Sequence, residues 1–214
     1  MIGIAGAGAF GTALAVALAR NGREVMLWAR DPTQVAALAA TRRNERHLPG
    51  VVLPANVSAT AEIASLAGSD VVLLAVPMQV LGRFLATRAP NLNGKSLVAC
   101  CKGIDLQTGA GPSATMAAHC PMSARALLTG PGFAADIARG LPTALTLAGG
   151  SEALQHLLST PSLRLYTTDD VVGAELGGAL KNVVAIAAGI VIGAGLGASA
   201  RAALMSRGFA EMVR

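Results

Sequence analysis

A glycine pattern near the start of the chain constrains the fold more than any other feature of the sequence. The pattern is G-A-G-A-F-G over residues 6–11, and it follows a short apolar run over residues 1–5. An apolar helical stretch comes next, over residues 9–21, and a second apolar run occupies residues 24–29. A strand, a glycine turn, a helix and a second strand in this order are typical of a βαβ unit that binds a dinucleotide.

Each glycine of this turn is expected to have its own physical role. Gly6 permits the tight turn, Gly8 lets the backbone approach a pyrophosphate, and Gly11 allows the helix to pack closely on the strand. The helix that begins at Ala9 presents free N–H groups and the positive end of its dipole to the phosphates. The turn is therefore predicted to hold the phosphates of a dinucleotide cofactor.

The first 150 residues go on alternating apolar runs with helical patterns, as expected for a parallel sheet covered by helices. A second helix is predicted to open at Asp31-Pro32, with Asp31 as its cap and Pro32 at its first position. Further strands are predicted over residues 70–76, 97–101, 126–129 and 145–148. The predicted class is therefore α/β, with a Rossmann-like doubly wound parallel sheet.

The pattern of residue types along the sequence changes near residue 169. Residues 169–196 and 199–213 are predicted as two long helices rich in alanine and glycine, with no strand between them. We therefore divide the chain into a dinucleotide-binding domain, residues 1–168, and the incomplete beginning of a helical substrate-binding domain, residues 169–214. Residues 182–200 carry no charged side chain, but their glycines favour a helix buried inside a soluble protein over one inserted in a membrane.

Composition and charge exclude several classes of protein. Hydrophobic residues make up 53% of the chain and charged residues 14%, which excludes intrinsic disorder. The three cysteines have neither disulfide nor metal-ligand spacing, so we expect no metal site and a cytoplasmic protein. The net charge of +5 is scattered apart from one short basic cluster at residues 42–47, so no nucleic-acid partner is expected. A small phosphorylated ligand explains the charge more simply.

The end of the second predicted strand bears on the choice of cofactor. Proteins that bind NAD usually place an acidic side chain there to hold the ribose hydroxyls. This chain has Arg30 followed by Asp31, and a guanidinium binds a 2′-phosphate through two hydrogen bonds. NADP(H) is therefore favoured, and NAD(H) is the alternative if Arg30 is only a solvated side chain.

A candidate general base lies in the first long helix of the C-terminal part. Lys181 is surrounded there by residues with almost no charge, and burial lowers the pKa of a lysine towards neutrality. A base of this kind suits the proton transfer that accompanies a hydride transfer. The alternative is a core lysine whose stem is buried and whose ammonium reaches solvent.

Six segments of the chain resemble the NAD(P)-dependent glycerol-3-phosphate dehydrogenases of bacterial type. In the order of the family they are GAGAFGTALA (6–15), LWAR (27–30), CKGI (101–104), LTGPGFAADIARGLPTA (128–144), GGALKNVVAIAAGI (177–190) and ARAALMSRGFAEM (200–212). The resemblance covers the whole chain, which corresponds to the N-terminal part of the family's length, so a C-terminal truncation is expected.

The resemblance implies an oxidoreductase that interconverts dihydroxyacetone phosphate and sn-glycerol 3-phosphate and feeds phospholipid synthesis. It implies that Phe10 contacts the cofactor at the glycine turn and that Arg30 contacts its adenosine-ribose end. Lys102 would approach both cofactor and substrate, and Lys181 would be the catalytic base. Two cations in one pocket suit an anionic substrate and the alkoxide that develops during the reaction.

Further positions follow from the same resemblance. Gly130 and Gly132 would line the substrate pocket, and Ala134 would touch the cofactor. The chain departs from the family at Gly132, where a serine or threonine is usual, and at Ser199, where an asparagine is usual. A homodimer is expected, because two helices alone leave apolar surface uncovered.

Two other functions are compatible with the same residues. One is another reductase with a Rossmann-like domain followed by helices, of the ketopantoate or hydroxy-acid type. The other is a module that binds NADPH without catalysing a reaction, which would keep the glycine turn and Arg30 and lack a complete active site.

Overall fold

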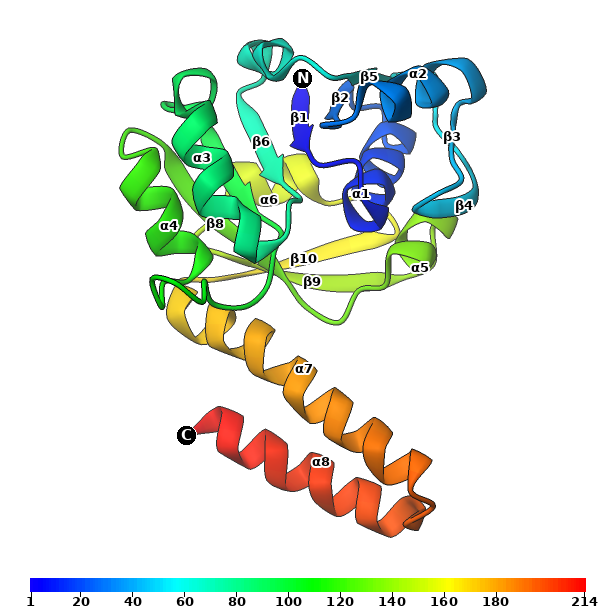
Figure 1. Cartoon of the computed structure of the whole chain (residues 1–214), viewed down its shortest axis with the longest axis vertical. Coiled ribbons are helices and arrows are strands. Elements are labelled where there is room, and N and C mark those ends of the chain that lie inside the picture. The colour runs from blue at the N-terminus through cyan, green and yellow to red at the C-terminus, as the bar shows by residue number, and fades with distance from the viewer.

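The computed structural model describes all residues 1–214, and an eight-stranded sheet forms the centre of its larger part (Figure 1). The order of the strands across the sheet is β10-β9-β8-β7-β6-β1-β2-β5. The strands are β1 (Ile2–Ala5), β2 (Val25–Trp28), β5 (Val57–Thr60), β6 (Val71–Leu74), β7 (Ser96–Ala99), β8 (Ala124–Thr129), β9 (Thr143–Ala148) and β10 (Leu163–Thr168). A separate antiparallel ribbon consists of β3 (Arg43–Asn44) and β4 (Leu48–Val52).

Helices cover both faces of this sheet. They are α1 (Ala9–Arg20), α2 (Pro32–Thr41), the 3₁₀ helix η1 (Ile63–Gly68), α3 (Met78–Leu92), α4 (Pro112–His119), α5 (Ala134–Arg139) and α6 (Glu152–Leu158). Two longer helices, α7 (Val171–Gly193) and α8 (Gly197–Val213), form a hairpin that projects from the sheet (Figure 1). The doubly wound α/β class predicted from the sequence is confirmed.

The core is divided into two apolar layers by the sheet. Side chains from α1, α2, α5 and α6 pack on one face, and side chains from η1, α3 and α4 pack on the other. Alternate residues of one strand enter opposite layers, as the period of two in a strand requires: Val71 and Leu73 join the first layer, and Val72 and Leu74 join the second. The many alanines of α1 let it lie close to the sheet, and nine of its twelve residues are buried.

The last two strands, β9 and β10, run opposite to the other strands of the sheet. Strand β9 pairs antiparallel with β8, whereas every other neighbouring pair in the sheet is parallel. The connection from β8 to β9, residues 130–142, contains one helix, the six-residue α5. A parallel crossover needs about a dozen residues or more, so this connection is close to the minimum, and the chain re-enters the sheet at the end at which it left. The parallel direction expected from the sequence holds for the strands from β5 to β8 and is wrong for β9; β10, which was not predicted, runs parallel to β9.

The predicted strands and the capped second helix are present, with ends that shift by a few residues. Asp31 caps α2 as expected, and its carboxylate accepts a hydrogen bond from the N–H of Thr33 at 2.9 Å. Strands β5 and β10 were not predicted. The first long C-terminal helix ends at Gly193 and not at residue 196, because a turn over residues 194–196 precedes α8.

The expectation that residues 182–200 form a helix buried on most sides is wrong. In that stretch only Ala188 and Val191 are buried, and α8 has no buried residue at all. The two helices pack on each other closely enough that a Cβ on Gly208 would lie 2.8 Å from Val184. By length and composition alone, α7 could cross a membrane, although that test is passed by many core helices.

Candidate active site

A cleft of about 680 Å³ opens at the carboxyl ends of the central parallel strands. Three stretches that directly follow β1, β6 and β7 contribute most of its wall, together with the end of β2. This is the edge at which open α/β sheets bind their ligands. The lining residues are Gly6, Ala7, Gly8, Ala9, Phe10, Trp28, Ala29, Arg30, Gln34, His47, Ala75, Val76, Pro77, Met78, Val80, Phe84, Cys100, Cys101 and Lys102.

The glycine turn forms the floor of this cleft. Gly6 has a φ of +124°, and a Cβ there would collide with the carbonyl of Ala75. A Cβ on Gly11 would collide with the carbonyl of Gly6, so the missing side chain lets α1 begin directly against the turn. A Cβ on Gly8 would meet nothing within 4 Å, so its backbone faces open space from which a phosphate can approach.

Two amide side chains that the sequence did not single out brace the same turn. Asn44 is buried and donates to the carbonyl of Ala7 at 2.9 Å and to Oγ1 of Thr12 at 2.7 Å. Gln34 donates to the same carbonyl at 2.8 Å. The conformation of the turn is therefore held from outside by β3 and α2. No local pattern around Asn44 indicated this, because the contact spans 37 residues.

Arg30 lies exposed at the end of β2, on the wall of the cleft. Its neighbour Asp31 is occupied as the cap of α2. His47, which was not among the predicted site residues, lines the same cleft. The wall next to the glycine turn therefore presents a cationic side chain, and the nearby carboxylate is bound to backbone.

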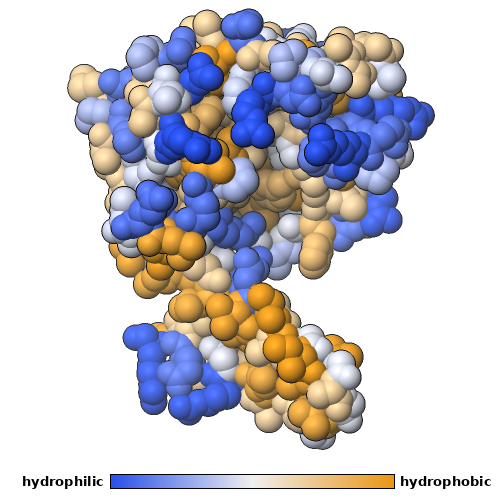
Figure 2. All heavy atoms as spheres, viewed as in Figure 1, coloured by the Kyte–Doolittle hydropathy of each residue, from blue (hydrophilic) through white to orange (hydrophobic).

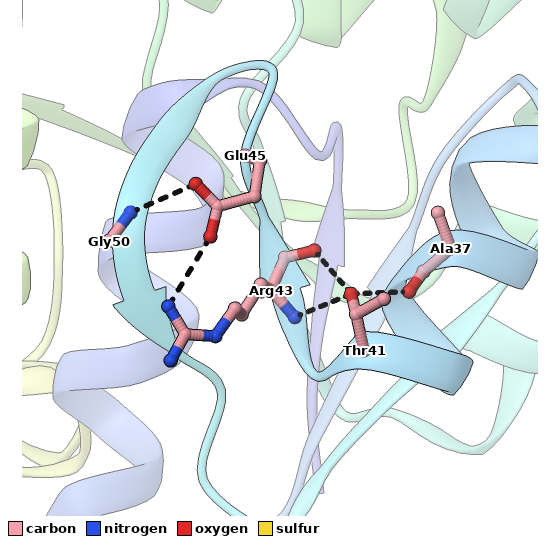
Figure 3. Close-up of polar contacts among 5 residues, drawn as sticks. All are labelled: Ala37, Thr41, Arg43, Glu45 and Gly50. Carbon is pink, nitrogen blue, oxygen red and sulfur yellow. Dashed lines mark hydrogen bonds and ion pairs between the residues drawn. The ribbon is translucent and has the colours of Figure 1, made fainter.

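Most of the basic cluster at residues 42–47 has structural roles. Arg42 donates to the carbonyls of Val57 and Pro54, which ties the end of α2 to the start of β5. Glu45 contacts Nη1 of Arg43 at 3.4 Å and accepts a hydrogen bond from the N–H of Gly50 at 3.1 Å (Figure 3). These contacts shape the β3–β4 ribbon.

The two lysines singled out from the sequence approach each other from different parts of the fold. Lys102 follows β7, and its Nζ lies 5.1 Å from the centre of the Phe10 ring at the glycine turn. Lys181 comes from α7 and donates to the carbonyl of Gly130 at 3.0 Å, just past the end of β8. Burial and the positive charge of Lys181 lower the pKa of Lys102. Two of the three lysines in the chain therefore meet at one place.

The remaining predicted positions lie beside the cleft and not on its lining. Gly130, with a φ of +138°, and Gly132 follow β8, and Ala134 opens α5. A Cβ on Gly132 would lie 2.9 Å from Leu145 and 3.2 Å from both Ile137 and Thr143, so apolar neighbours occupy the place of the usual hydroxyl side chain. Ser199 is exposed near the start of α8.

The cysteines are buried and free. Cys100 and Cys101 border the cleft, where burial raises the pKa of both thiols, that of Cys101 to about 11. They are therefore neutral thiols at physiological pH and act as small apolar side chains.

The glycine turn, the cleft and the exposed Arg30 define a dinucleotide-binding protein of the Rossmann class, with a pair of lysines at the edge of its site. Residues 1–155 match the family model of the N-terminus of NAD-dependent glycerol-3-phosphate dehydrogenase, and residues 170–214 match the model of its C-terminus. The chain belongs to this family.

Individual relatives agree with the family models. A protein of Cereibacter sphaeroides named glycerol-3-phosphate dehydrogenase [NAD(P)+] is 62% identical over 100% of this chain and 67% of its own length. A protein of the same name from Paracoccus denitrificans is 58% identical. The crystal structure of glycerol-3-phosphate dehydrogenase from Coxiella burnetii has a TM-score of 0.93 and 35% identity, over 100% of this chain and 67% of that one. The chain thus spans about two thirds of the length of these relatives.

The alternative prediction, another reductase with a Rossmann-like domain followed by helices, is not favoured. A ketopantoate reductase from Ralstonia eutropha shares the fold with a TM-score of 0.63, but it has only 22% identity and covers 83% of this chain. That likeness extends to the fold alone.

Proposed function

We propose that this chain interconverts dihydroxyacetone phosphate and sn-glycerol 3-phosphate in the cytoplasm, with NADP(H) as the favoured cofactor and NAD(H) as the alternative. The observation that carries this proposal is the meeting of Lys181 from α7 with Gly130 at the end of β8, next to Lys102 at the cleft. We further propose that residues 1–168 hold the cofactor and that the helical part from residue 169 contributes to the substrate site.

The residues of the cleft fit a dinucleotide. The open space over Gly8 and the N–H groups at the start of α1 suit a pyrophosphate, and Arg30 suits a 2′-phosphate. Phe10 and Lys102 contact each other on the lining of the cleft, and Ala134 begins α5, which packs on α1. A bound reduced nicotinamide would supply the hydride for the reaction.

The lysine pair supplies the acid–base chemistry in this proposal. Lys181 holds a proton on Nζ, oriented by the carbonyl of Gly130, and donates it to the carbonyl oxygen of dihydroxyacetone phosphate as the alcohol forms. In the oxidative direction Lys181 removes the hydroxyl proton. Lys102 provides a second positive charge, which stabilises the developing alkoxide and attracts the phosphate of the substrate.

Replacement of Lys181 tests this assignment. Lys181→Ala should lower kcat for dihydroxyacetone phosphate reduction at least about 100-fold, the scale of a lost general acid. NADPH affinity, measured by nucleotide fluorescence, should stay unchanged. Lys95→Ala is the matched control, because Lys95 donates to the carbonyls of Ala67 and Ser69 and lies outside the cleft lining. Turnover of Lys181→Ala within a few-fold of the parent would contradict the mechanism.

The exposed face of α7 supports a homodimer. A stripe of apolar side chains recurs at the intervals of three, four and seven residues that are typical of a helix–helix contact, and it forms the orange surface of α7 in Figure 2. Each of its side chains is between 45% and 66% exposed, so the stripe offers a continuous apolar surface to a partner. The stripe consists of Val172, Leu176, Val183, Ile186 and Ile190.

We propose that a second copy of this chain covers the stripe, so that two α7–α8 hairpins form a four-helix contact. Light scattering should give the mass of a dimer, and Ile186→Glu combined with Ile190→Glu should give a monomer. Leu106→Glu, at an even more exposed apolar residue outside the stripe, should leave the dimer intact. A monomeric parent protein would overturn this arrangement.

A further inference from the structure

Glu175 connects α7 to α4, one of the helices that pack on the second face of the sheet. Its Oε1 accepts a hydrogen bond at 2.5 Å from the backbone N–H of Ser113, in the first turn of α4. Helix α4 has no side-chain cap of its own, so Glu175 supplies the acceptor and the negative charge that the start of a helix lacks. A Cβ on Gly111 would lie 2.5 Å from Oε2 of Glu175, so the glycine leaves room for the carboxylate.

A second contact holds α7 three residues further along. Gly178 is buried against the end of β8, and a Cβ there would lie 2.7 Å from Oγ1 of Thr129. That hydroxyl is itself buried and has no hydrogen-bond partner. The absent side chain of Gly178 therefore lets α7 approach β8 to the distance that the hydroxyl allows.

Both contacts precede Lys181 on the same rigid helix. Glu175 and Gly178 lie six and three residues before it, or about 9 Å and 4.5 Å along the axis. Beyond Lys181 the helix extends away from the sheet into the hairpin with α8 (Figure 1). The reach of the lysine to the carbonyl of Gly130 thus depends on how the first turns of α7 are fixed.

We propose that Glu175 is a positioning residue for Lys181: by binding the start of α4 it fixes α7, and with the Gly178–Thr129 contact it holds the ammonium of Lys181 at Gly130 and next to Lys102. The catalytic consequence rests on the proposed function. The geometric part does not, because it concerns only where α7 places a lysine.

The small number of lysines allows a direct measurement. Protein labelled with ¹³C at lysine Cε gives three signals, from Lys95, Lys102 and Lys181. Their assignment by single Lys→Arg variants and their titration with pH report the surroundings of each amine without any substrate. In Glu175→Ala we expect the pKa of Lys102 to rise towards the ordinary value of 10.5, since Lys181 withdraws and the site opens to water.

Two variants serve as controls in the same experiment. Glu175→Gln keeps an oxygen that accepts from Ser113 and removes a negative charge that acts on Cys101, so the pKa of Lys102 should not rise in this variant. Glu152→Ala removes an exposed carboxylate from the first turn of α6, which packs on the other face of the sheet from α4, and should leave the titration of Lys102 unchanged. The signal of Lys95 should be constant throughout.

Substitutions at the second contact, between Gly178 and Thr129, test the proposal independently. Gly178→Ala should raise the pKa of Lys102 as Glu175→Ala does, and adding Thr129→Ala should reverse the shift, because it removes the hydroxyl that the new methyl group meets. A folded Glu175→Ala protein with unchanged lysine titrations would overturn the proposal, as would a shift of equal size in Glu175→Gln. If Glu175→Ala fails to fold, the comparison of Gly178→Ala with the double variant Gly178→Ala/Thr129→Ala replaces it. A rise in the pKa of Lys102 that Thr129→Ala reverses supports the proposal, and no rise in Gly178→Ala refutes it. Loss of turnover in Lys181→Ala is tested separately, so the two proposals can fail independently.

Discussion

Replacement of Asn44 by alanine should weaken the fold and the cofactor site together. The side chain is 3% exposed and donates two hydrogen bonds to groups near the glycine turn, the carbonyl of Ala7 and Oγ1 of Thr12. One buried hydrogen bond contributes about 0.5–1.5 kcal/mol, and a buried group left without its partner costs about 1–3 kcal/mol. The carbonyl of Ala7 keeps its bond to Gln34, whereas Thr12 is 1% exposed and loses this partner. The expected loss is about 2–3 kcal/mol, or about 4–12 °C in Tm for a chain of this size.

The assay combines thermal unfolding, followed by circular dichroism, with NADPH titration followed by nucleotide fluorescence. We expect Asn44→Ala to lower both Tm and affinity, because Ala7 belongs to the turn that receives the phosphates.

Asn56→Ala is the matched control for this prediction. Its amide also donates two hydrogen bonds to backbone, at 2.9 Å to Ala19 and 2.8 Å to Arg23, but at the opposite end of α1. This variant should lose a similar amount of stability and bind NADPH as the parent does. Unchanged affinity in Asn44→Ala, or an equal loss of affinity in Asn56→Ala, would refute the assignment of Asn44 to the turn.

Three further predictions concern charge and ionisation at the cleft. Arg30→Ala should weaken NADPH by roughly 1.5–3 kcal/mol, the scale of a hydrogen bond to a charged group, and leave NADH nearly unaffected; equal losses would exclude contact with a 2′-phosphate. Burial and Lys181 lower the pKa of Lys102 in the folded protein, so its amine binds a proton more tightly in the unfolded chain. At any pH below the lowered pKa, the positive charge of Lys102 therefore reduces the free energy of unfolding. Lys102→Met should therefore raise Tm at pH 7, with the gain disappearing as pH rises through 10.5, and a pH-independent difference would contradict this cause. Finally, because burial raises the pKa of the Cys100 and Cys101 thiols, a thiol reagent at pH 8 should modify them at least about 100-fold more slowly in the native than in the unfolded protein. Equal rates in the two states would contradict this prediction.

The parts of the fold that were predicted are those encoded by neighbouring residues. The glycine turn, the cap at Asp31 and the apolar run at residues 70–76 each depend on a few consecutive positions. The same holds for the choice of Lys181, whose uncharged surroundings lie on its own helix.

The features that were missed depend on contacts between distant segments. Strand β5 pairs with β2 across 32 positions in the register, from Val25 to Val57, and carries no strong apolar alternation of its own. The hydrogen bond of Glu175 to Ser113 joins residues 62 apart. The direction of β9 is defined by its antiparallel pairing with β8, which the sequence pattern did not reveal. The burial of α7 was mispredicted because apolar composition shows that a helix needs a partner and does not show whether one is present.

The reversed direction of β9 has a consequence for the order in which the protein folds. Because β10 runs parallel to β9, its last residues lie at the end of the sheet where β8 begins, and α7 starts there and runs alongside β8. Lys181 can reach the end of β8 only after this reversed pair has joined the sheet. Strand β10 is also an edge strand with one neighbour, so its pairing is expected to be among the last formed and the first lost in local opening. The nucleotide cleft, which the central strands complete by themselves, can therefore persist in molecules in which β10 has opened and the lysine pair is apart.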